Sequence, residues 1–74
     1  MMDYAVYIID DDPFVRDGLS MVLKKEYRIK ALATAEDGVA AVDNDPPDIV
    51  FLDIGLPGMS GIEALELIKK AILK

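Results

Sequence analysis

Two short apolar segments of this chain each end directly in aspartate. Residues 6–9 (Val-Tyr-Ile-Ile) run into an aspartate triplet at 10–12, and residues 49–52 (Ile-Val-Phe-Leu) run into Asp53. If the two segments are neighbouring strands, their carboxylates meet at one end of a sheet. Carboxylates packed that closely repel each other, so they need a cation or a proton to coexist. The spacing therefore predicts a site of cation chemistry.

Two kinds of chemistry suit such a cluster. Carboxylate oxygens in a tight acidic site are ligands for Mg²⁺. A carboxylate can also attack phosphorus and form an acyl phosphate, while a metal neutralises charge on the phosphoryl group. Taken singly, each aspartate also has a structural explanation: Asp12 before Pro13 is typical of a helix cap, and Asp53 simply ends a strand. The repetition of the pattern favours a site, formed by Asp10, Asp11 and Asp53.

The segments that position these aspartates alternate between strand and helix patterns. The expected strands are residues 4–9, 27–33 and 49–52, and the expected helix N-caps are Asp12, Thr34 and Ser60. The expected apolar faces are Phe14, Leu19, Val22 and Leu23 on the first helix and Ile62, Leu65, Ile68 and Ile72 on the last. Strands that alternate with helices predict an α/β fold with a parallel sheet and right-handed crossovers. In such sheets ligands bind at the carboxyl ends of the strands.

Composition excludes several classes of function. The 74 residues are enough for one domain. A net charge of −6 argues against nucleic acid or an anionic membrane as a partner. With no cysteine and no histidine, disulfides, thiolate zinc sites and histidine bases are excluded. We expect a cytoplasmic protein, because no apolar run has membrane-spanning length and the start lacks a basic signal-peptide region.

Motifs over nearly the whole chain resemble the receiver domain of two-component response regulators. Residues 6–13 resemble the first strand and acidic loop of that family, and residues 47–53 resemble its third strand and phosphoacceptor. Residues 56–61 resemble its Pro-x-Met-x-Gly loop, and residues 35–38 with Ala41 match its second-helix motif. The resemblance implies a flavodoxin-like fold and a role in phosphorelay signalling.

The resemblance also implies a role for each site residue. Asp53 would accept a phosphoryl group from a sensor histidine kinase. Asp11 would bind Mg²⁺ directly, Asp10 would assist through water, and the backbone carbonyl of Gly55 would be a further ligand together with Asp53. The segment would be a phosphorylation switch and no enzyme itself.

The sequence departs from the family in its extent. Residues 1–74 correspond to the first three β-α units, with strand order 2-1-3, of the five-stranded order 2-1-3-4-5. The family's switch Ser or Thr on the fourth strand and its lysine on the fifth have no counterpart here. The resemblance therefore implies a truncated receiver domain in which phosphorylation is impaired.

An incomplete sheet would leave the third strand at an edge. An apolar edge strand invites pairing, so we expect a homodimer in which two such edges pair antiparallel across a two-fold axis. The alternative function is a dimerising interaction module with a vestigial acidic site. An aspartate-nucleophile phosphatase is less supported, because Pro13 and Phe14 follow the aspartate triplet where those enzymes usually have a small or β-branched residue.

Overall fold

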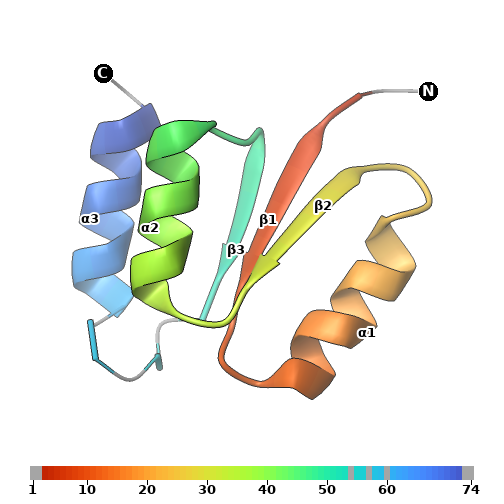
Figure 1. The fold of residues 1–74 in the computed structure, drawn as a ribbon, viewed down its shortest axis with the longest axis horizontal. Helices are drawn as coiled ribbons and strands as arrows, with labels where there is room; N and C mark the ends of the chain where they lie inside the picture. Colours follow the sequence, from red (N-terminus) through yellow and green to blue (C-terminus); the bar gives the residue numbers. More distant parts are fainter. Residues whose placement is uncertain (1–2, 54, 57, 60, 73–74) are drawn as a thin grey trace.

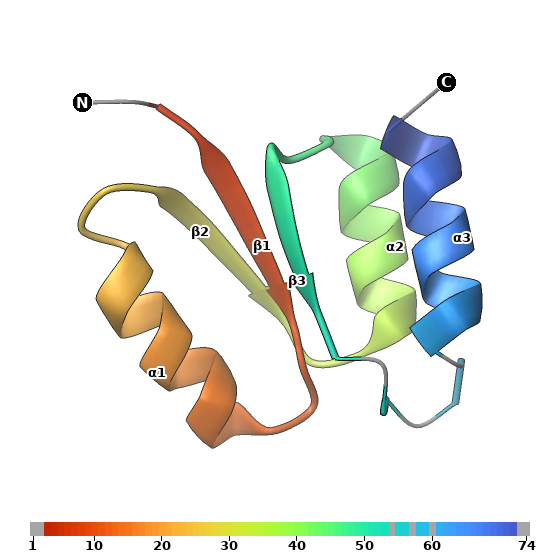
Figure 2. The same ribbon diagram turned by 180° about the vertical axis from the view of Figure 1, so that it is seen from behind.

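The chain folds into a three-layer α/β structure. The computed structural model describes residues 3–53, 55–56, 58–59 and 61–72. Its elements are β1 (Ala5–Ile9), α1 (Pro13–Leu23), β2 (Arg28–Leu32), α2 (Ala35–Asn44), β3 (Ile49–Leu52) and α3 (Gly61–Ile72). The sheet lies in the middle, with α1 on one face and α2 and α3 on the other (Figures 1 and 2). This order confirms the predicted β-α-β-α-β-α topology.

The central strand β1 aligns the other two. The strand order is β2-β1-β3, as predicted, and both pairings are parallel. Ile9, the last residue of β1, pairs with Leu32 of β2 and with Leu52 of β3. The carboxyl ends of all three strands therefore lie level at one edge of the sheet, at the bottom of Figure 1.

The hydrophobic core lies between the sheet and the pair α2 and α3. Tyr7 and Ile9 of β1 are buried there against Val42 of α2 and Ile68 of α3. Successive side chains of a strand point to opposite faces, so Val6 and Ile8 point to the α1 face, and the core is built on alternate residues of β1.

The N-caps of the first two helices are confirmed. A carboxylate oxygen of Asp12 accepts the Phe14 N–H at 2.9 Å, and the Thr34 hydroxyl accepts the Asp37 N–H at 3.0 Å. Each bond satisfies a backbone donor that the first turn of a helix leaves without an intrahelical partner. The third predicted cap, Ser60, lies outside the described residues.

The predicted apolar face of α1 is wrong for two of its members. Phe14 and Val22 are 87% and 71% exposed, whereas Leu19 and Leu23 are half-buried. The physical reason is that α1 packs mainly on β1 and β2, so only a narrow side of the helix touches the sheet. Helix α1 has no fully buried residue.

The apolar stripe predicted for α3 is also only partly right. Ile68 is buried, but three other members are exposed by 40 to 72%: Ile62, Leu65 and Ile72. The buried face consists instead of Gly61, Ala64, Ile68 and Ala71. Helix α3 packs chiefly against α2, and small residues let two helices approach closely. The neighbour of the helix, rather than its apolar periodicity, decides which side is buried.

Two helix-interior glycines are expected to respond oppositely to alanine. A Cβ at Gly38 in α2 would overlap the buried side chain of Ile9, whereas a Cβ at Gly18 in α1 would meet no atom within 4 Å. Overpacking typically costs about 1–3 kcal/mol, and the helix-propensity gain of Gly→Ala is about 1 kcal/mol. We therefore expect Gly38→Ala to lower the free energy of unfolding and Gly18→Ala to raise it. Urea denaturation measures both; a stabilised Gly38→Ala protein would contradict this packing.

Candidate functional site

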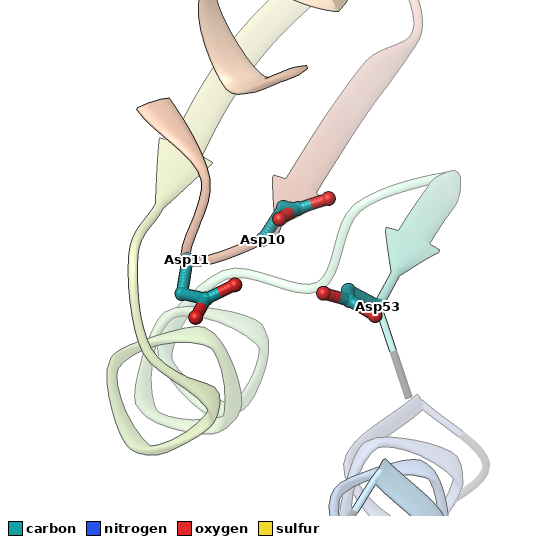
Figure 3. A group of neighbouring side chains, drawn as sticks. All are labelled: Asp10, Asp11 and Asp53. Atoms are coloured by element: carbon teal, nitrogen blue, oxygen red, sulfur yellow. The ribbon is translucent and has the colours of Figure 1, made fainter. Parts of the chain in front are cut away.

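Three carboxylates converge at the carboxyl end of the sheet. One oxygen from each of Asp10, Asp11 and Asp53 lies within 4.8 Å of the others, and Figure 3 shows the three side chains facing a common space. Asp10 and Asp11 directly follow β1, and Asp53 directly follows β3. Asp10 and Asp53 are half-buried, and Asp11 is exposed. The parallel pairing of β1 and β3 thus brings together the residues that the sequence singled out.

Backbone hydrogen bonds fix where this cluster stands relative to the sheet. The Asp53 N–H donates to the Ile9 carbonyl at 2.9 Å, and the Asp10 N–H donates to the Leu32 carbonyl at 3.1 Å. Both bonds extend the ladders of β1 by one residue past the strand ends. The backbone that carries the two half-buried carboxylates is therefore held by the sheet itself.

Side-chain turns then orient two of the three carboxylates. Oδ1 of Asp10 accepts the Asp12 N–H, and Oδ1 of Asp53 accepts the Gly55 N–H, both at 2.9 Å. Aspartate commonly bonds the backbone two residues on in this way. One oxygen of each carboxylate is thereby fixed, which sets the direction of the other.

The remaining predicted residues stand at the rim of the cluster. The Asp12 carboxylate caps α1, as its helix-cap interpretation predicts. Gly55 lies beside Asp53, to which its N–H is bonded; metal binding by its carbonyl stays a prediction.

Among the described residues, one cation touches this loop, and no sequence pattern pointed to it. Nη1 of the half-buried Arg16 donates to the Asp10 carbonyl at 2.8 Å. The arginine is the fourth residue of α1 and reaches back to the end of β1. A side chain six residues along the chain meets this carbonyl only because α1 folds back over the sheet.

A hollow adjoins the acidic cluster on the α1 side. Its volume is about 240 Å³, and its lining consists of Ile8, Ile9, Asp10, Leu19, Phe51, Leu52 and Asp53. It lies between β1 and β3, where the strand order reverses, which is the usual ligand position of an open α/β sheet. The fold and the site together define an α/β domain with an acidic crevice at its topological switch point.

Comparison with known proteins gives the family. The profile of the response regulator receiver domain matches residues 6–73, so the chain belongs to the receiver domain family of two-component signalling. The chain is 39% identical over 66 residues to a protein-glutamate methylesterase/protein-glutamine glutaminase from Nitrosospira multiformis, covering 85% of this chain and 19% of that protein. It is 38% identical over 68 residues to the transcriptional regulatory protein YdfI from Bacillus subtilis, covering 88% and 32%.

Solved structures agree with this assignment. A response regulator receiver domain protein from Methanospirillum hungatei matches with a TM-score of 0.89 and 33% identity over 93% of this chain and 56% of that one. The N-terminal domain of a receiver protein from Methanoculleus marisnigri matches with a TM-score of 0.83 and 36% identity over 89% and 55%. The chain thus spans a little over half of these solved chains and a smaller part of the curated relatives, whose named activities belong to those longer proteins.

Across the described ranges of the chain, every helix is too short or too polar to cross a membrane.

The cluster of like charges is expected to cost stability when no cation is bound. Two unit charges 4–5 Å apart repel by about 1 kcal/mol in a water-like dielectric, and salt screens the effect. We expect Asp11→Asn to raise the free energy of unfolding by about that amount in low-salt, metal-free buffer. Asp17→Asn, the same change at an exposed position outside the cluster, serves as control. An equal effect of both variants, or no dependence on salt, would contradict repulsion within the cluster.

Proposed function

We propose that this chain is a receiver segment of a cytoplasmic phosphorelay, in which Asp53 accepts a phosphoryl group from a sensor histidine kinase. The same pocket binds Mg²⁺ through Asp10, Asp11, Asp53 and the carbonyl of Gly55. The observation that carries the proposal is the convergence of three carboxylates within 4.8 Å in a chain that belongs to the receiver family. Each is a hard oxygen donor of the kind that Mg²⁺ prefers.

The proposed reaction is a phosphoryl transfer to a carboxylate. An oxygen of Asp53 attacks phosphorus, the P–N bond to the kinase histidine breaks, and the leaving imidazole nitrogen takes up a proton from solvent; the product is an acyl phosphate. Because Oδ1 of Asp53 is bonded to the Gly55 N–H, Oδ2 is the attacking oxygen. Mg²⁺ held by Asp10, Asp11, Asp53 and the Gly55 carbonyl would neutralise negative charge on the transferring group. The turns at Asp10 and Asp53 hold the carboxylates in place beforehand.

The extent of the chain bears on the rate of this reaction. The chain contains three β-α units, which we propose to be the first three of a receiver domain. The hydroxyl and the lysine that the family resemblance assigns to a fourth and a fifth strand are not among these residues. We therefore propose that the segment alone accepts phosphate slowly.

Phosphorylation at Asp53 is directly testable. After incubation with Mg²⁺ and a small acyl phosphate, we expect intact mass to show the addition of one phosphoryl group to the wild-type chain and to Asp17→Asn. Asp53→Asn should gain none, because an amide cannot form the acyl phosphate, and chelation of Mg²⁺ should abolish the modification. Modification of Asp53→Asn would contradict the assignment. An unmodified wild type that still binds Mg²⁺ saturably would leave only the metal-binding role.

The exposed edge of the sheet supports a second candidate function, a dimerising interaction module. Strand β3 is the edge of the described sheet, and Ile49 and Phe51 are 45% and 44% exposed. Val50 and Leu52 pack on the core, so the alternation of side chains puts Ile49 and Phe51 on the α1 face. Apolar edge strands invite pairing, and a two-fold axis would pair two β3 strands antiparallel.

This dimer makes a sharp prediction about one edge residue. Light scattering at micromolar concentration should give the mass of two chains for the wild type and of one chain for Phe51→Lys, because a charge at an edge opposes pairing. Phe14→Lys, the same change at an exposed position on α1, should remain dimeric. A wild-type mass of one chain, or dissociation of both variants alike, would exclude pairing through β3.

A further inference from the structure

The contact of Arg16 with the acidic loop is unusual for its position in a helix. Arg16 is the fourth residue of α1, whose first turn holds no acidic side chain. A cation near the N-terminus of a helix is unfavourable toward the helix dipole. The position of Arg16 is therefore poorly explained by the stability of α1.

The hydrogen bonds around Arg16 connect Asp10, at the end of β1, with Asp12, the N-cap of α1. Nη1 of Arg16 donates to the Asp10 carbonyl at 2.8 Å. The backbone N–H of Arg16 donates to the Asp12 carbonyl at 3.0 Å. Within the same turn, the Asp12 N–H donates to Oδ1 of Asp10 at 2.9 Å. The side chain of Arg16 thus closes a loop of hydrogen bonds around Asp11, whose carboxylate is exposed.

We propose that Arg16 is a positioning residue for the acidic site: its bond to the Asp10 carbonyl holds the turn at residues 10–12 so that Asp10 and Asp11 face Asp53. The inference rests on the proposed magnesium-binding function. The proposed role concerns the geometry of the carboxylate ligands. Arg16 donates to a backbone carbonyl, so the carboxylate oxygens stay available to a cation.

The direction in which Mg²⁺ affinity changes when Arg16 is removed distinguishes a positioning role from a purely electrostatic one. Removing a positive charge beside a cation site would, by Coulomb's law alone, tighten the binding of Mg²⁺. Loss of a positioning bond should weaken it, and loss of an outer partner of a metal ligand typically costs about 10-fold or more in affinity. The two explanations thus predict opposite changes.

Calorimetric titration of the whole chain with Mg²⁺ makes the test. We expect Arg16→Ala to bind Mg²⁺ about 10-fold more weakly than the wild type, and Arg16→Lys, which retains an N–H donor and the charge, to recover most of that loss. The matched control is Arg28→Ala, which removes the same charge at the opposite end of the sheet, where Arg28 pairs with Asp3 on the surface. It should leave the affinity within about 2-fold of wild type, because exposed charges more than a Debye length away are largely screened.

A metal-free measurement adds a second readout. Amide exchange should become faster at Asp12 in Arg16→Ala than in Arg28→Ala, since the Asp12 N–H is bonded within the clamped turn. Equal or tighter Mg²⁺ binding by Arg16→Ala, or an Arg16→Lys variant as weak as Arg16→Ala, would overturn the positioning role while leaving the proposed function intact. A wild type without saturable Mg²⁺ binding would overturn both.

Discussion

The parallel pairing of β1 with β3 is the constraint on which the site depends. The ladder runs from Val6 opposite Ile49 to Ile9 opposite Leu52 and continues with the bond from the Asp53 N–H to the Ile9 carbonyl. A slip of one residue would reverse which face each side chain points to and would separate the acidic ends. Burial of β1 on both faces makes such a slip costly, so the hydrophobic core fixes the position of a polar site outside it.

The acidic site groups like charges, and like charges at short distance repel each other. Three carboxylates meet in one crevice, and such a cluster favours a bound cation. Turns at Asp10 and Asp53, together with the contact of Arg16 with the backbone, hold these groups without neutralising their oxygens. A pocket arranged in this way in advance would lose little conformational entropy on binding a cation.

The two faces of the sheet are unequally covered by helices. One face carries the buried core, and the other carries the exposed apolar residues of β3. The face under α2 and α3 holds the buried cluster around Ile9, Val42 and Ile68. The opposite face carries α1, which has no fully buried residue, and leaves Ile49 and Phe51 partly exposed. The first face holds the hydrophobic core, and the second contains both the acidic crevice and the proposed dimer edge.

The sequence by itself determined the order and type of the elements, two helix caps and the residues of the acidic cluster, because these follow from local patterns: apolar runs, Asp-Pro and Thr-x-x-Asp starts, and aspartates at strand ends. Only the tertiary structure decided which helix sides are buried and that Arg16 meets the Asp10 carbonyl. Ile62 and Ile72 belong to the predicted apolar stripe of α3, yet the helix packs chiefly against α2, and its buried residues include Ala64 and Ala71. Local sequence patterns identify the apolar side chains of a helix. Which of these side chains are buried depends on the surface that packs against the helix in the folded protein.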